Sequence, residues 1–142
     1  MAGRSHARRQ ALDILYQADV TGVDARTVLD EWEASGRDIP GFTRELVEGA
    51  SAHAGELDAL IGDRAEGWTV PRMATVDRNI LRLACFELLH RSDVPVSVAI
   101  NEAVEAAKEL STEDSSRFVN GILGRIASEA VGDAPVSVDG SD

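Results

Sequence analysis

The segment TVDRNILRLACFELLH, residues 75–90, decides the fold of this chain. Its apolar residues recur at intervals of three and four, which is the spacing of a helix face. They form two adjoining stripes, one of Val76, Ile80, Leu83, Ala84 and Leu88 and the other of Leu81, Cys85 and Leu89. A helix that is apolar on most of its sides must be covered by other elements, so we expect this one to be the central helix of the protein.

The flanking segments show the same periodicity. Helical patterns occur over residues 7–20, 25–34 and 42–65, with a break expected near Gly55, and again around residues 98–110 and 118–126. Turn-rich stretches separate them, and no segment reads convincingly as a strand. We therefore predict an all-α fold of about seven helices, forming one domain over residues 1–130. Residues 131–142 lose the periodicity, and we expect them to form a flexible acidic tail.

The balance of charge argues against nucleic acid for the chain as a whole, but not for each part of it. The 142 residues carry 14 Lys and Arg against 25 Asp and Glu, a formal net charge of -11. Such a protein does not attract a polyanion through its overall field. Residues 1–12, however, contain Arg4, Arg8 and Arg9 and no acid. This basic patch suits a polyanionic partner and is equally compatible with an ordinary charged terminus.

The sequence contains no recognisable motif of an enzyme active site. His6, His53 and His90 lie far apart, without the spacing of metal ligands, and no phosphate-binding glycine loop or nucleophile elbow is present. The single cysteine, Cys85, sits in an apolar run and is expected to be a buried, inert thiol. We predict no catalytic residue, no metal site and no cofactor. No apolar stretch is long enough to span a membrane, and a cytoplasmic location is expected.

Phe118 is the residue whose role the spacing leaves open. It precedes the core positions Val119 and Ile122 of the last helix and lies at the edge of their stripe. It is either a core residue or an edge aromatic that stacks on an unpaired base, which is worth roughly 1–3 kcal/mol. Gly121, which weakens this helix, indicates that another backbone approaches closely there. Tyr16 on the first helix is likewise either a core residue or a contact for a partner.

Several motifs, in order along the chain, resemble the NusB family of transcription antitermination factors. They are VDRNILRL from residue 76, SDVP from residue 92, AINEAVEAAK from residue 99, and DS followed by FVNGIL over residues 114–123. The N-terminal pattern of Ala7, Ala11, Leu15 and Tyr16 also resembles the opening helix of that family. Residues 22–70 match only in helical character.

The resemblance implies a NusB-like fold of two small helical bundles. It also implies binding to the boxA element of ribosomal RNA transcripts together with NusE, a ribosomal small-subunit protein, within the antitermination complex of RNA polymerase. The RNA-binding positions of the family correspond here to Arg4, Arg8, Arg9, Arg78, Arg117, Phe118 and Asn120. The positions that face NusE correspond to Tyr16 and Asp77.

Two questions stay open at this point. A helical adaptor that binds only proteins would also suit the acidic composition. The resemblance is compatible with either a monomer or a homodimer.

Overall fold

The computed structural model describes residues 3–132, and within this range it consists of seven α-helices and one 3-10 turn, with no strand. None of these helices is long and apolar enough to cross a membrane. The elements are α1 (Gly3–Thr21), α2 (Ala25–Ala34), α3 (Gly41–Ala52), α4 (Ala54–Arg64), η1 (Val70–Arg72), α5 (Thr75–His90), α6 (Val96–Leu110) and α7 (Glu113–Gly132).

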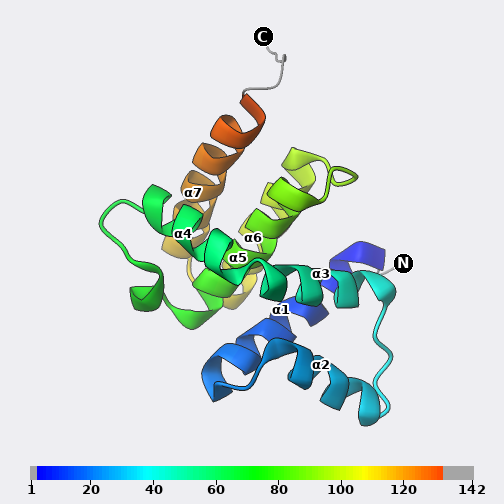
Figure 1. The fold of residues 1–142 in the computed structure, drawn as a ribbon. Helices are drawn as coiled ribbons and strands as arrows, with labels where there is room; N and C mark the ends of the chain where they lie inside the picture. The colour runs from blue at the N-terminus through cyan, green and yellow to red at the C-terminus, as the bar shows by residue number, and fades with distance from the viewer. Residues whose placement is uncertain (1–2, 133–142) are drawn as a thin grey trace.

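The helices form two small bundles, as the family resemblance implied, and the bundles share one continuous core. Helices α1, α2 and α3 pack on one another, and α4 to α7 form the second group. In Figure 1, α1 and α2 lie below the nearly collinear pair α3 and α4, while α6 and α7 rise side by side on the other side of that pair. The core is made mainly of Ala, Leu, Val and Ile, in keeping with the low aromatic content.

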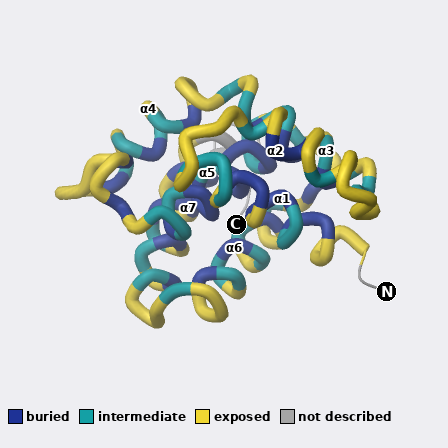
Figure 2. Tube along the Cα trace, turned by 90° about the horizontal axis from the view of Figure 1, so that it is seen from below, coloured by how far each residue is buried: buried dark blue, intermediate teal, exposed yellow. Residues whose placement is uncertain are grey.

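The helix α5 is the centre of the molecule. It contacts α1, α3, α4, α6 and α7, and nine of its 16 residues are buried. Figure 2 shows the buried positions gathered around α5 and the exposed ones along the outer turns. The prediction of a central helix over residues 75–90 is confirmed. Cys85 is fully buried, as predicted, and burial raises the pKa of its thiol to about 12, which disfavours the reactive thiolate.

Polar contacts set the register of α1 against α5. Near the start of α1, the Arg8 guanidinium donates to both carboxylate oxygens of Glu87 at 2.8–3.0 Å. Near its end, Asp19 accepts from Arg78 and Asn79 at 2.7–2.9 Å. Because Glu87 lies at the end of α5 and Arg78 at its beginning, the two helices run antiparallel.

Several predicted boundaries need correction. The first helix begins at Gly3, so all three N-terminal arginines are helical. The break expected near Gly55 lies at His53, which separates α3 from α4.

The close approach predicted at Gly121 is wrong, since a Cβ there would meet only the end of Arg125 at 4.0 Å. A glycine is required instead at Gly49, where a Cβ would lie 2.0 Å from the Phe86 ring. The predicted tail lies outside the described residues, except for residues 131 and 132, which end α7.

The buried Arg8–Glu87 pair gives a first test. Arg8 and Glu87 expose only 9% and 2% of their side chains. Burial raises the pKa of Glu87, while Arg8 opposes that rise. Substituting Arg8→Ala leaves Glu87 buried without its cation and should lower the free energy of unfolding by about 3–5 kcal/mol in urea titrations. Arg9→Ala, which removes an exposed pair, should cost less than about 1 kcal/mol. Equal losses in the two variants would contradict this account.

Candidate nucleic-acid and protein interface

A hollow of about 600 Å³ lies beside the start of α7, where the sequence placed its candidate aromatic. It is walled by the segment between α4 and α5 and by the first turns of α5 and α7. Its lining residues are Trp68, Arg72, Met73, Ala74, Asp77, Asp114, Ser115 and Phe118. We call this hollow the aromatic pocket.

Phe118 is neither a core residue nor a fully exposed one. It is half-buried and packs against the edge of the core, with Val119 fully buried beside it. Its ring meets the indole of Trp68 edge to face, with centroids 6.3 Å apart and planes at 70°. Trp68 is 49% exposed, an unusual state for so large an apolar side chain. Two aromatic surfaces thus border the same pocket and are accessible to a planar ligand.

The helix that carries Phe118 is anchored at its first turn. The Thr112 hydroxyl accepts a hydrogen bond from the Ser115 backbone N–H at 2.9 Å, which is an N-cap contact. Glu113 and Asp114 place negative charge in the first turn, where the helix dipole favours it. The polar turn over residues 111–115 therefore fixes the position of Phe118 relative to α5.

Asp77 lies in the lining of the pocket and is incompletely satisfied. It is only 7% exposed, and its Oδ2 accepts a hydrogen bond from the Ser115 hydroxyl at 2.8 Å. Its Oδ1 is buried and has no hydrogen-bond partner among the described residues. A buried carboxylate oxygen without a donor is costly and uncommon in folded proteins. Asp77 therefore stands in the pocket wall with one oxygen buried, and a donor from a partner molecule would reach that oxygen only if the wall moved.

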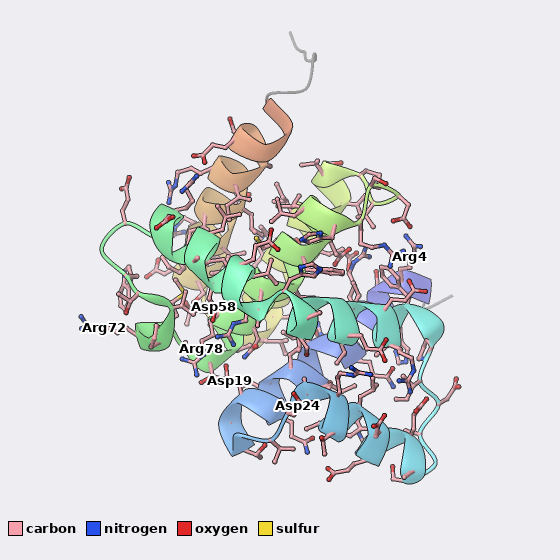
Figure 3. All side chains as sticks on the ribbon, in the orientation of Figure 1. Arg4, Asp19, Asp24, Asp58, Arg72 and Arg78 are labelled. Atoms are coloured by element: carbon pink, nitrogen blue, oxygen red, sulfur yellow. The ribbon has the colours of Figure 1, made fainter. Side chains whose placement is uncertain are left out.

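Arg78 is held by its neighbours. Its guanidinium forms two 2.7 Å bonds to Asp19, which also pairs with Arg82 at 3.0 Å. The hydrogen bond from Arg78 is the largest cause of a lowered pKa at Asp19, to about 2. In Figure 3 Arg78 and Asp19 lie together on the side of the molecule that also carries Arg72. The charge of Arg78 is thus largely neutralised within the fold.

The three N-terminal arginines are all paired with acids. Arg4 bonds Asp93 at 2.9 Å and lies over the Phe42 ring, and Arg9 bonds Glu109 at 2.6 Å. Both pairs are exposed. Arg8 is different, since its pair is buried in the interior. Arg4 and Arg9 can exchange partners at low cost, whereas Arg8 cannot.

The fold does not bring the basic patch against Phe118. Glu87, the partner of Arg8, lies ten residues after Asp77 on α5, a separation of about 15 Å along the helix. Figure 3 places Arg4 on one side of the molecule and Arg72 on the other. Arg9 pairs with Glu109, which lies in the last turn of α6, a few residues before α7 begins. The predicted residues thus do not form one cluster, and Arg8 lies in the interior.

The remaining predicted residues lie on exposed or half-exposed surface. Arg117 and Asn120 are exposed on α7, and Arg117 pairs with Asp114 one turn away. Tyr16 is 44% exposed on α1, so it is not a core residue.

Two residues of the pocket escaped the sequence analysis. Trp68 was taken as part of a connector over residues 67–71, and Arg72 was not singled out. Arg72 is exposed and forms no salt bridge with any residue that the structure describes. The signal for Trp68 was present, since a turn-rich connector has no need of a large aromatic side chain.

The ion pairs of Asp19 predict a pH dependence of stability. Because its folded pKa lies below its unfolded value of 3.8, Asp19 stabilises the fold above pH 4 and loses this effect as the pH falls towards 2. At pH 6 the free energy of unfolding of the wild-type protein should exceed that of Asp19→Asn by about 1–2 kcal/mol, a figure reduced for partial solvent exposure. The difference should shrink between pH 4 and pH 2 in urea titrations. Asp30→Asn, at an exposed carboxylate, should show no such trend. A pH-independent gap would contradict the assignment.

The helical fold and the pocket together define a binding protein with an aromatic surface and a buried acceptor. Comparison with known proteins then identifies its family. The family model of the NusB family matches residues 5–128, and the chain belongs to the NusB family.

Relatives and solved structures agree with this assignment. The chain is 53% identical to the transcription antitermination protein NusB of Saccharopolyspora erythraea, over 89% of this chain and 88% of that protein. The corresponding protein of Streptomyces avermitilis is 46% identical, over 89% and 92%. Among structures, NusB of T. maritima superposes with a TM-score of 0.81 at 37% identity, over 89% of this chain and 91% of that one. A crystal structure of NusB and NusE with double-stranded RNA gives 0.80 at 27% identity, over 91% and 98%.

Proposed function

We propose that this protein is a transcription antitermination factor that binds the boxA element of ribosomal RNA transcripts together with NusE. Its role is to bind and assemble, without catalysing a reaction, and it acts in the cytoplasm beside RNA polymerase. The observation that carries this proposal is the aromatic pocket, in which two accessible rings border a buried, partly unsatisfied carboxylate. The relative crystallised with NusE and RNA supports the choice of partners.

Base stacking is assigned to the rings of the pocket. Phe118 lies near the capped start of α7, and Trp68 adds a second, exposed face. Stacking on an aromatic face accepts any unpaired base, so affinity depends on the rings and sequence preference on the polar groups beside them. Arg72, Arg117 and Asn120 supply such groups.

Phosphate contacts are assigned to the exposed arginines. A phosphate that reaches Arg4 or Arg9 replaces Asp93 or Glu109 as the partner of the guanidinium. Since exposed ion pairs contribute only about 0–1 kcal/mol, the exchange costs little. Arg8 and Arg78, which the resemblance also places at the RNA, serve mainly to hold α1 on α5. The salt dependence of binding should accordingly be modest, because few phosphates are neutralised.

Contact with NusE is assigned to Asp77 and Tyr16. Tyr16 offers an exposed ring on α1, and the buried Oδ1 of Asp77 would accept a donor from a protein partner once the pocket wall opened. Both lie on helices that the Asp19–Arg78 contact binds together, so a partner touching both would meet a rigid surface.

Substitutions at Phe118 test the stacking role. In gel-shift titrations with boxA RNA and NusE, Phe118→Ala should weaken binding by about 1–3 kcal/mol. Phe118→Asp should abolish the shift, because a charged side chain would replace the ring. Circular dichroism should show unchanged helix content in both variants. Val23→Asp, at another exposed apolar residue, should bind as wild type does. Unfolding of Phe118→Asp would indicate a core residue instead.

Substitution of Glu109 tests the exchange of partners. Glu109→Gln removes the acid that competes with phosphate for Arg9 and should tighten RNA binding by up to about fivefold. Glu105→Gln makes the same change in net charge one turn earlier on the same helix, where the carboxylate pairs with Lys108 rather than with an arginine of α1, and should have a smaller effect. If the two variants gain equally, only net charge matters and the competition is refuted.

A helical adaptor without RNA contact is the second candidate function. It is favoured by the formal net charge of -11 and by the pairing of all three N-terminal arginines with acids. A gel shift with boxA RNA, with and without NusE, separates the two functions. Absence of a shift under both conditions would support the adaptor.

A further inference from the structure

We propose that His53, Glu56 and His90 form a binding site for one divalent transition-metal ion of the zinc type. The two histidines are 37 positions apart in the sequence, and the fold brings their rings together with centroids 3.9 Å apart and planes at 20°. The sequence spacing alone had argued against any metal site.

The ligand atoms already have nearly the geometry that an ion requires. The Nδ1 atom of His53 and the Nε2 atom of His90 each lie 3.1 Å from the same oxygen, Oε1 of Glu56. A tetrahedral ion with bonds of about 2.0 Å holds its ligand atoms about 3.3 Å apart. All three ligand atoms lie within 4.8 Å of one another. Because an imidazole nitrogen binds in the plane of its ring, the two nearly parallel rings must also turn towards each other to coordinate one ion.

The surrounding structure holds the two rings in place. His53 joins α3 to α4, Glu56 stands in the first turn of α4, and His90 ends α5. Phe86 stacks against both histidines, at 5.9 Å from His53 and 5.5 Å from His90. Phe86 itself is 6% exposed and fits over Gly49, where a side chain would collide with it. The histidine rings therefore rest on a part of the core that cannot easily move.

The donor set determines the class of ion. Two imidazole nitrogens and one carboxylate oxygen suit Zn²⁺, Co²⁺, Ni²⁺ or Cu²⁺, whereas Mg²⁺ and Ca²⁺ prefer oxygen ligands alone. The three side chains are 30–52% exposed, so an ion can enter from solvent and keep water in its fourth position.

Binding of a metal ion would link His53, the residue between α3 and α4, to His90 at the end of α5. This site is separate from the aromatic pocket, because His90 and Asp77 are 13 residues apart on α5, about 20 Å along the helix. Failure of the metal proposal would therefore leave the proposed RNA function untouched, and the reverse also holds.

Isothermal titration of untagged, full-length protein with ZnCl₂ provides the test. Wild-type protein should bind one equivalent, and its thermal midpoint should rise by several degrees at a free zinc concentration well above Kd. His53→Phe and His90→Phe keep the stacked rings and remove a ligand nitrogen, so each should weaken binding by at least about tenfold. Glu56→Gln, on an exposed side chain, should do the same without disturbing the fold. His6→Ala, at the third and exposed histidine, should bind like wild type.

Two results would overturn the proposal. One is the absence of saturable zinc binding to folded wild-type protein. The other is retention of the site when His53→Phe and His90→Phe are combined. Titration with Co²⁺, followed by its visible absorption, gives a second measurement on wild-type protein that does not depend on the folding of any variant.

Discussion

The central helix α5 carries buried polar side chains, and the arrangement of the other helices depends on satisfying them. Glu87 accepts a hydrogen bond from Arg8 of α1, and Asn79 donates one to Asp19 at the other end of α1. Asp77 accepts one from Ser115 of α7. Apolar packing alone tolerates a shift along a helix, because one leucine can replace another against a neighbour. A buried carboxylate does not, since it loses its hydrogen bonds when the register changes. These contacts therefore set where α1 and α7 lie on α5, and hence where the aromatic pocket forms.

The pairing of arginines with acids also determines the character of the proposed functional surface. A chain with a net charge of -11 has enough acids to pair with its arginines, and the structure pairs most of them. In the proposed function, binding of a polyanion is an exchange of partners at exposed pairs, with affinity supplied mainly by the aromatic rings. Burial decides which arginines take part, because an exposed pair opens at little cost while the Arg8–Glu87 pair is locked in the interior. The adaptor function rests on the same pairing.

The sequence predicted correctly those features that depend on residues close together along the chain. The period of apolar residues located α2 and α5 at their observed bounds, and the polar residues 111–115 indicated the capped start of α7. The prediction failed where the answer depended on a distant residue. Gly121 was assigned a close contact that in fact belongs to Gly49, because the ring of Phe86 comes from another helix. Trp68 was passed over as part of a connector, because its neighbour Phe118 is 50 positions away.

By itself, the sequence determined the all-helical class, the central place of α5, the buried state of Cys85 and, through ordered motifs, the NusB family. These follow from periodicity and residue type, which are properties of short segments. Only the tertiary structure decided that Arg8 is buried while Arg4 and Arg9 are exposed, that Trp68 joins Phe118, and that His53 meets His90 over Glu56. The physical reason is common to all three. Burial, pairing and ring contact are relations between residues that are distant in the sequence. The antiparallel packing of α1 on α5, the contact of the segment between α4 and α5 with α7, and the place of His53 beside the end of α5 bring those residues together.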